Sequence, residues 1–345
     1  MAEKKRVVLV GSGNWGSAIA RIVGVNVQEH KEFHPAVKMW VFEEMVDGRK
    51  LTEIINEQHE NTKYLPGFKI PENVVACPDV METVKDADIL IFVLPHQFIR
   101  KVCQDINDHV KRGAFGISLI KGIDSSEGGI QLISDVIHKM LHIDMSVLMG
   151  ANLARDVAKE DFCEATIGSR YTEQGKILKL LFDRPHFRTN VVPDVATVEL
   201  CGALKNIVAV GAGFCDGLKY GTSTKAAVMR IGLLEMSKFV AIYYGGVQMS
   251  TLLESCGVAD LICTSFGGRN RRIAEAFALT GKPIEVLEAE LLNGQKLQGP
   301  LTAKEVHDVL EEDGRVEEFP LMTAVYRVCY EGLPVQDLLK VISKL

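Results

Sequence analysis

Residues 7–24 read VVLVGSGNWGSAIARIVG, and three glycines, Gly11, Gly13 and Gly16, follow four apolar residues. A helix-like run comes after them. The pattern G-x-G-x-x-G between a strand and a helix is the fingerprint of a dinucleotide-binding turn. The first glycine permits the tight turn, the second lets the backbone approach a pyrophosphate, and the third lets helix and strand pack closely. The alternative is a purely structural turn between the two elements.

Outward from this turn, short apolar runs alternate with helix-like stretches as far as residue 192. Near-continuous apolar strands spaced by helices predict a mostly parallel sheet that is covered on both faces. We therefore expect an α/β fold with a Rossmann-type, doubly wound sheet in residues 1–192. The expected strands lie within residues 6–10, 37–42, 73–77, 87–95, 114–120, 145–150, 163–169 and 187–192.

After Pro193 the pattern becomes helical, beginning with a long run that is apolar nearly all round, typical of a buried helix. Gly211, Gly213 and Gly217 follow no strand, and we interpret them as sites of close helix packing. We expect an all-α domain in residues 193–345. Its predicted helices lie within residues 194–218, 224–244, 271–279, 283–292, 302–312 and 334–344.

Composition narrows the class of protein. The 345-residue chain has a net charge of −6, which disfavours a general nucleic-acid partner. No apolar run approaches the roughly 20 residues of a membrane span, and MAEKKR leads directly into a strand, so we expect no integral membrane segment and a cytoplasmic location. The eight cysteines contain no C-x-x-C pair, and we interpret most of them as buried hydrophobes.

An acidic residue follows the second expected strand, in VFEE at residues 41–44. An acid at this place in a dinucleotide site accepts hydrogen bonds from the adenosine ribose, and Glu43 is the candidate. This favours NAD over NADP, although Arg49 and Lys50 follow closely. The alternative is that Glu43 is a solvated loop carboxylate.

Two isolated lysines stand in apolar surroundings. Lys205 interrupts CGALKNIVAV, and the residues four positions away on either side, Cys201 and Ala209, are apolar. The alternative for Lys205 is a side chain that reaches the surface along its aliphatic stem. Lys121 in ISLIKG ends an expected strand, where open α/β sheets bind ligands. Because burial lowers the pKa of a lysine toward the range useful for proton transfer, Lys205 is a candidate acid/base for a carbonyl or anionic substrate.

A glycine pair, Gly267 and Gly268, precedes Arg269 and Asn270 at the expected start of a helix. Glycines, a forked cation and an amide at a helix start suit a phosphate group. The alternative is a basic first turn on a surface helix. Asp260, nearby in the sequence, could orient a lysine or be a plain helix carboxylate.

Two other polar features give weaker evidence for a functional site. Lys296 and Gln298 stand between glycines in LLNGQKLQGP, which alone predicts an ordinary surface loop, although such loops can close over a site. His138 and His142 have the spacing of a metal pair on a helix, but no third ligand is offered, so we expect a solvated helix face and no metal site.

Together these residues resemble the NAD-dependent glycerol-3-phosphate dehydrogenases of the eukaryotic cytosolic type, including their close "1-like" paralogues. The resemblance covers nearly the whole chain in order. It implies NADH-dependent reduction of dihydroxyacetone phosphate to sn-glycerol 3-phosphate, the reverse oxidation, and usually a homodimer joined through the helical domain. The matching stretches are GSGNWGSAIA, KMWVFEE, HENTKYLPG, VLPHQF, SLIKG, SVLMGAN, CGALKNIVAVGAGFCDGL, TKAAV, ESCGVADL, GGRNR and LLNGQKLQGP.

The resemblance also implies roles at matching positions. For NAD, it implies contacts from Gly11, Ser12, Gly13, Asn14, Trp15, Gly16, Phe42, Phe98, Ala154, Arg269, Lys296 and Gln298. For catalysis, it implies Lys205 as the acid/base, with Lys121, Asn206, Asp260 and Thr264 around it. For the phosphorylated three-carbon substrate, it implies Lys121, Arg269 and Asn270.

Some positions depart from the family pattern and concern fine substrate positioning rather than the type of reaction. They are Thr222 and Ser223 in place of Asp-Asn, Cys263, Ser265 and Phe266 in place of Thr, Cys and Tyr, and Leu153 in place of Ile. Two other functions stay open at this point: a dehydrogenase of another small hydroxy acid, and an NADH-binding redox sensor without turnover.

Overall fold

A computed structural model describes residues 3–126, 129–246, 248–292 and 296–343. The chain divides into two compact units. The first consists of Met1–Ile120, Ile133–Leu148 and Asn152–Val195, and the second of Lys121–Leu132, Met149–Ala151 and Ala196–Leu345. The domain boundary expected at residues 192–193 stays a prediction.

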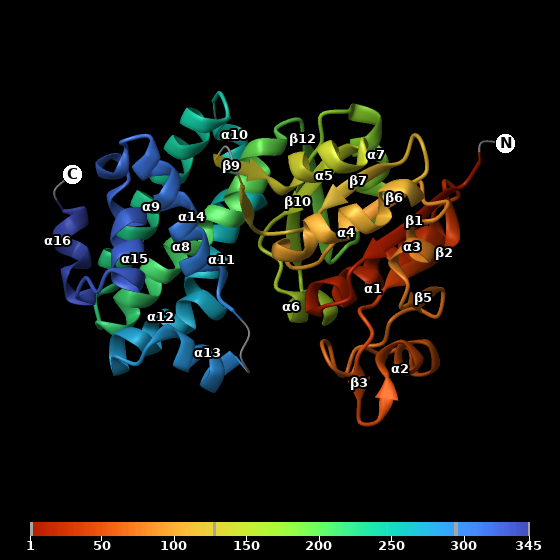
Figure 1. Cartoon of the computed structure of the whole chain (residues 1–345), viewed down its shortest axis with the longest axis horizontal. Coiled ribbons are helices and arrows are strands. Elements are labelled where there is room, and N and C mark those ends of the chain that lie inside the picture. Colours follow the sequence, from red (N-terminus) through yellow and green to blue (C-terminus); the bar gives the residue numbers. More distant parts are fainter. Residues whose placement is uncertain (1–2, 127–128, 247, 293–295, 344–345) are drawn as a thin grey trace. The chain divides into compact units, whose positions relative to one another are not determined.

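The first unit is built on an eight-stranded sheet (Figure 1). Its strand order places consecutive strands outward in both directions from β1 and β6, which is the doubly wound order of Rossmann folds. Within this sheet, every strand pair whose register is described is parallel. The α/β fold class predicted from the sequence is therefore confirmed. In spatial order the strands are β12 (Phe187–Val192), β11 (Cys163–Gly168), β10 (Asp144–Met149), β7 (Phe115–Ser118), β6 (Ile89–Phe92), β1 (Lys5–Val10), β2 (Phe33–Trp40) and β5 (Val74–Cys77).

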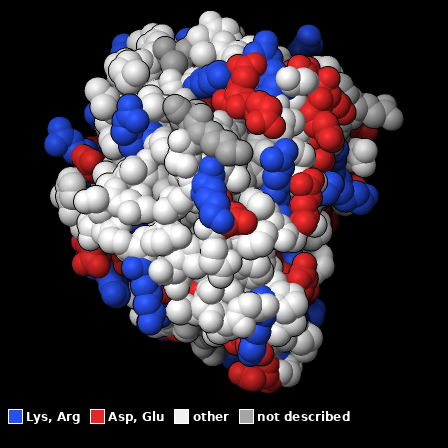
Figure 2. All heavy atoms as spheres, turned by 90° about the vertical axis from the view of Figure 1, so that its left-hand side faces the viewer, with Lys and Arg blue, Asp and Glu red and all other residues white. Residues whose placement is uncertain are grey.

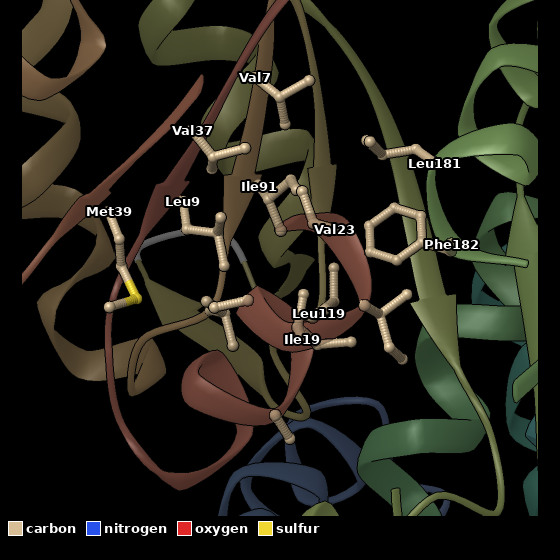
Figure 3. Packing of buried hydrophobic residues seen from close by; sticks show 14 of the residues in the cluster. Val7, Leu9, Ile19, Val23, Val37, Met39, Ile91, Leu119, Leu181 and Phe182 are labelled. Atoms are coloured by element: carbon tan, nitrogen blue, oxygen red, sulfur yellow. The ribbon is translucent and has the colours of Figure 1, made fainter. Parts of the chain in front are cut away.

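Helices cover both faces of this sheet, because successive side chains of a strand point to opposite faces. Val7 and Leu9 of β1 lie in one hydrophobic cluster with residues of α1 (Asn14–Glu29) and α7 (Thr172–Phe182). Figure 3 shows Leu9 of β1, Ile91 of β6 and Ile19 of α1 within this cluster. Val8 and Val10 lie in a second cluster with residues of α4 (Ile99–Ile106) and α5 (Ile133–Leu141).

The remaining elements of the first unit are short. A small hairpin, unexpected from the sequence, closes through Asp47 and Gly48, which both have positive φ angles, of 49° and 78°. Asp-Gly is a preferred pair for such a two-residue turn. The short elements are β3 (Met45–Val46), β4 (Arg49–Lys50), α2 (Leu51–Gln58), α3 (Val80–Val84), η1 (His96–Phe98), η2 (Asn107–His109) and α6 (Ala154–Ala158).

The second unit is mainly helical and also contains one hairpin (Figure 1). The hairpin pairs β8 (Ile123–Ser126) with β9 (Gly129–Leu132). The helices are α8 (Val195–Gly217), α9 (Thr222–Tyr243), α10 (Met249–Leu252), the π-helical turn η3 (Ser255–Ala259), α11 (Asp260–Phe266), α12 (Arg269–Thr280), α13 (Ile284–Leu292), α14 (Gln298–Glu312), η4 (Val316–Glu318), α15 (Pro320–Tyr330), η5 (Val335–Asp337) and α16 (Leu338–Ile342).

Helix α8 is the core helix of this unit. Within the described ranges it is the one helix long and apolar enough to cross a membrane, which corrects our expectation that no apolar run has that length. Of its most apolar window, 94% is buried inside the protein, as in the core helix of a soluble fold. A Cβ at Gly213 would lie 2.3 Å from the Arg271 carbonyl oxygen of α12, which confirms the close helix packing predicted there.

Candidate active site

The glycine turn of the first unit has no room for side chains at two of its three glycines. Gly11 has a φ angle of 123°, and a Cβ there would lie 2.5 Å from the Val93 carbonyl oxygen, at the end of the neighbouring strand β6. A Cβ at Gly16 would lie 2.6 Å from the Gly11 carbonyl oxygen. Both positions therefore require glycine, the first for the turn and the second for the packing of α1 against it.

Gly13 differs, because a Cβ at this position would meet no atom within 4 Å. Gly13 is also the N-cap of α1, without a side-chain hydrogen bond to the helix end, and the first turn of α1 contains no acidic residue. The N-terminal N–H groups and the positive end of the helix dipole therefore face open space. These features fit the pyrophosphate of a dinucleotide.

A buried side-chain amide stabilises the glycine turn, and we did not predict it from the sequence. Asn61 donates through Nδ2 to the Ser12 carbonyl oxygen at 2.8 Å and to the Ser17 hydroxyl at 2.9 Å. The Asn14 side chain donates to the Tyr64 carbonyl oxygen at 2.7 Å. The stretch 61–64 thus fixes the turn. A single asparagine in a polar stretch gives no sequence signal for such a role.

Three residues of the first unit expected to contact the cofactor lie just after strands or at a helix start. Phe42 follows β2 and is 70% exposed, and Phe98 in η1 is 54% exposed. Both rings are therefore accessible to a ligand. Ala154 begins α6 and packs partly on the core. The Trp15 ring, in contrast, packs against Phe187 in the core, so its backbone is the part available to a ligand.

The structure gives Glu43 a partner that the sequence did not suggest. Its carboxylate accepts hydrogen bonds from the Thr52 hydroxyl at 2.6 Å and from the Thr52 backbone N–H at 3.3 Å, at the start of α2. Glu43 is therefore neither a free loop carboxylate nor an acceptor whose lone pairs are all available to a ribose. It stabilises the N-terminus of α2.

The second unit buries the lysine that the sequence singled out. Lys205 lies on α8 and is 4% exposed. Its ammonium donates to Asp260 Oδ1 at 2.5 Å and to Thr264 Oγ1 at 2.6 Å, both on α11. Burial lowers the pKa of Lys205 to about 8, although the nearby Asp260 carboxylate acts in the opposite direction. A lysine in this state can both donate and accept a proton near neutral pH.

A second lysine shares the same carboxylate. Lys121 Nζ lies 3.2 Å from Asp260 Oδ2 and also donates to the Gly150 carbonyl oxygen at 3.3 Å. Asp260 is buried, so two ammonium groups surround one desolvated carboxylate. This arrangement has a net positive charge in a region of low dielectric constant, where an anionic ligand is favoured. Asp260 is thus the residue that orients both lysines.

A chain of side-chain amides lies next to this group. Asn270 on α12 donates to Asn206 Oδ1 at 2.9 Å and accepts from the Gly299 N–H at 2.9 Å. The Asn206 amide donates to the Gly202 and Ala203 carbonyl oxygens of its own helix. Both asparagines are buried. These bonds make Asn206 and Asn270 a link between α8, α12 and α14.

Helix α12 begins as the sequence suggested. Its N-cap, Gly268, has a φ angle of 83° and makes no side-chain cap, and the first turn contains Arg269 but no acidic residue. A helix N-terminus without an internal cap offers its N–H groups to an anion, and the arginine adds a forked donor.

Lys121, Asn206, Arg269 and Asn270 line a cavity of about 100 Å³ within the second unit, whereas Lys205, Asp260 and Thr264 are not among its lining residues. Three of the side chains that line the cavity are cationic, and none of the lining side chains is a carboxylate. Such a lining suits a small phosphorylated ligand. The cavity is lined by Lys121, Asn206, Arg269, Asn270, Lys296, Leu297 and Gln298.

The positions that depart from the family pattern lie in different settings. Thr222 and Ser223 are exposed at the start of α9, Cys263 is half-buried on α11, and Ser265 is buried. Phe266 is exposed, and the Lys225 ammonium lies 4.3 Å from the centre of its ring. His138 donates through Nδ1 to the Ile143 carbonyl oxygen at 2.8 Å. In the part of the chain that the structure describes, no group of three His, Cys, Asp or Glu side chains is arranged to hold a metal ion.

A Rossmann-type unit with a glycine turn, and a helical unit with a buried lysine and a cationic cavity, define a nicotinamide-dependent dehydrogenase of a small anionic substrate. Residues 6–174 match the model of the N-terminal domain of NAD-dependent glycerol-3-phosphate dehydrogenase, and residues 194–340 match that of its C-terminal domain. The chain belongs to the NAD-dependent glycerol-3-phosphate dehydrogenase family.

Individual relatives agree with this assignment. The chain is 63% identical over 334 residues to the cytoplasmic NAD(+) glycerol-3-phosphate dehydrogenase of Rattus norvegicus, covering 96% of each chain. It is 61% identical over 335 residues to the human glycerol-3-phosphate dehydrogenase 1-like protein, covering 97% of this chain and 95% of that protein. The solved glycerol-3-phosphate dehydrogenase of Saccharomyces cerevisiae superposes with a TM-score of 0.92 at 44% identity, over 99% of both chains.

These findings confirm several predictions made from the sequence: the family, the NAD-linked dehydrogenase activity on glycerol 3-phosphate, NAD as cofactor and a cytoplasmic location. A redox sensor without turnover and a dehydrogenase of another hydroxy acid are not favoured.

Proposed function

We propose that Lys205 is the acid/base in the reversible conversion of dihydroxyacetone phosphate to sn-glycerol 3-phosphate. The observation that carries this proposal is the burial of its ammonium group between Asp260 and Thr264. When bound, the nicotinamide supplies or takes up the hydride at C2 of the substrate. Lys205 Nζ gives its proton to the C2 oxygen as negative charge develops there, and takes it back in the oxidation.

Asp260 keeps Lys205 charged and aligned between turnovers. A neutral carboxamide at this position would leave the Lys205 and Lys121 ammonium groups close together without compensation, which lowers the pKa of Lys205 further. Lys121, which shares Asp260, lines the cavity and polarises the substrate from a second side. Thr264 accepts from Lys205 and donates to Asp260 Oδ1 at 3.3 Å, so it relays orientation rather than charge.

The substrate phosphate is bound by Arg269 and the N-terminus of α12, in the cavity that Lys121 and Lys296 also line. Asn206 and Asn270 act here as positioning residues, because their amide groups bond to each other, to α8 and to α14. Their role is to hold α12 at the cavity. In the first unit, Gly13 and the N-terminus of α1 hold the pyrophosphate of NAD.

The working form of the enzyme is a homodimer joined through the helical unit, as the family resemblance implies. Exposed apolar side chains on this unit, such as Leu234 of α9 and Leu253, support such an interface. Figure 2 shows broad uncharged surface between Lys, Arg, Asp and Glu side chains on one face of the molecule. Light scattering on the purified protein tests this: a mass of 38.0 kDa at micromolar concentration contradicts it.

The activity is tested with NADH and dihydroxyacetone phosphate, by following the loss of NADH absorbance. Dihydroxyacetone without phosphate is the matched control substrate, because it keeps the carbonyl and loses the anion. We expect turnover with the phosphorylated substrate, a KM at least about 100-fold higher without phosphate, and competitive inhibition by inorganic phosphate. Equal turnover of both substrates, or no turnover of either, contradicts the proposal.

A further inference from the structure

The segment 296–298 leads into α14 and supplies Lys296, Leu297 and Gln298 to the lining of the cavity. A buried carboxylate on the preceding helix holds this segment. Glu288 of α13 accepts from the Leu297 backbone N–H at 2.9 Å through Oε1, and from Lys296 Nζ at 2.7 Å through Oε2. Glu288 therefore binds both the backbone and a side chain of this segment.

The two bonds differ in their surroundings. The Glu288 side chain is 7% exposed, whereas the Lys296 side chain is 70% exposed. The ion pair is therefore screened by water at its lysine end and contributes little. The bond to Leu297 is buried, and its loss would leave a desolvated N–H and a desolvated carboxylate oxygen without partners. The backbone bond is the stronger constraint.

A second bond fixes the other end of the segment. The Gly299 N–H donates to Asn270 Oδ1, which belongs to the amide chain beside the cavity. Gln298 lies between the two fixed points, and Lys296 lies just outside them. The segment is thus held at Leu297 from α13 and at Gly299 from α12, and its position relative to the cavity depends on both.

We propose that Glu288 is a positioning residue that sets the place of Lys296 and Gln298 at the substrate cavity through its bond to the Leu297 N–H. The proposal rests on the function proposed above, because it concerns the same cavity. It assigns Glu288 no contact with substrate or cofactor. Its effect on the reaction comes through the residues it holds.

Two conservative variants separate the effect of the length of the Glu288 side chain from the effect of its charge. Glu288→Gln keeps an oxygen at the same distance for the Leu297 N–H and removes the charge. Glu288→Asp keeps the charge and shortens the side chain by one methylene group, so it cannot reach Leu297 without movement of α13. Glu290→Gln is the matched control, since Glu290 lies on the same helix, is half-exposed and pairs with Lys282.

Hydrogen exchange at the Leu297 amide tests the anchor without any substrate. We expect exchange to accelerate about 10-fold or more in Glu288→Asp, and to stay within about threefold of the wild type in Glu288→Gln and Glu290→Gln. Unchanged exchange in Glu288→Asp overturns the proposal. Because no turnover is involved, this result stands whether or not the chain acts on dihydroxyacetone phosphate.

Steady-state kinetics then test the consequence for the site. In Glu288→Asp we expect the KM for dihydroxyacetone phosphate to rise about 10-fold with kcat within about threefold, and Glu288→Gln to restore most of the wild-type KM. A general loss of folding would instead lower the active fraction and leave KM unchanged. The opposite order, with Glu288→Asp normal and Glu288→Gln impaired, overturns the proposal, because the charge on Lys296 would then be what matters.

Discussion

The glycine turn of the first unit and the lysine site of the second unit illustrate two ways in which a fold builds a site. The turn works through the absence of side chains: Gly11 and Gly16 admit no Cβ, and Gly13 leaves open space before a helix end. The lysine site works mainly through side chains, with Lys205 and Lys121 around one buried carboxylate.

This difference decides what a substitution does in each region. At the turn, an added methyl group affects backbone geometry and thus either stability or ligand approach. At the lysine site, removal of one group leaves a buried charge without a partner. We therefore expect catalytic rate to fall more than folding stability. We expect the largest effects on rate at the lysine site.

Replacement of Lys205 tests the acid/base directly. We expect Lys205→Ala to lower kcat for dihydroxyacetone phosphate reduction by about 1,000-fold, because general acid catalysis by a positioned group contributes on that order. NADH binding, measured by fluorescence titration, stays unchanged. The matched control is Lys225→Met, since Lys225 is also a buried lysine paired with an aspartate, Asp216, which keeps Arg271 as a partner. Comparable loss of kcat in both variants contradicts the assignment.

Replacement of Asp260 tests how the lysine is tuned. Asp260→Asn removes the carboxylate that opposes the effect of burial, so the pKa of Lys205 falls below about 8. We expect kcat at neutral pH to fall about 100-fold and the alkaline limb of the reduction profile to move to lower pH. A pH–rate profile of the variant measures the shift. If the limb keeps its wild-type position, Asp260 does not tune Lys205.

Two glycine substitutions test the role of the glycine turn. Gly13→Ala adds a methyl group into open space, so we expect near wild-type stability and a Kd for NADH raised about 10-fold. Gly11→Ala combines a φ angle of 123° with a close approach to Val93, so it loses about 3 kcal/mol or more of stability. Thermal melts and NADH titrations check both. A Gly13→Ala protein that binds NADH normally contradicts the proposed place of the pyrophosphate.

The smallest effect is expected at Glu43. Its carboxylate bonds to the start of α2 through Thr52, so Glu43→Ala costs about 1 kcal/mol of stability, as for the loss of a helix cap. Its effect on the preference for NADH over NADPH is less than about threefold, because the carboxylate is already engaged. Chemical denaturation and the ratio of kcat/KM for the two cofactors measure these effects. A large change in that ratio would show that Glu43 recognises the ribose after all.

The sequence predicted the glycine turn and the eight main strands because their signals are local. A period of apolar residues, a glycine spacing and a strand–helix junction can each be read within about 20 residues. The same holds for Lys205, since a charged residue inside an apolar helix stands out against its neighbours. Fold class and candidate lysine therefore follow from short windows of sequence.

The partners of these residues could not be predicted, because they come from distant parts of the chain. Lys205 and Asp260 are 55 positions apart, and Lys121 and Asp260 are 139 apart. In the sequence, Glu288 does not differ from other acidic residues on helices. Its role depends on the folded chain, which brings the Leu297 N–H within hydrogen-bond distance of its carboxylate. Helix α15 was missed for a similar reason: Glu235 of α9 accepts from the Leu321 and Met322 N–H groups at its start.

The most direct test of the account is the pH dependence of hydride transfer in a single turnover, measured in both directions. The account predicts that reduction of dihydroxyacetone phosphate slows and oxidation of glycerol 3-phosphate accelerates as pH rises through a common midpoint near pH 8, because the protonated form of Lys205 serves one direction and the neutral form the other. Lys205→Ala loses this midpoint in both directions. Rates that do not change with pH around 8 in the wild type, or a midpoint that persists in Lys205→Ala, would contradict the claim that Lys205 moves the proton.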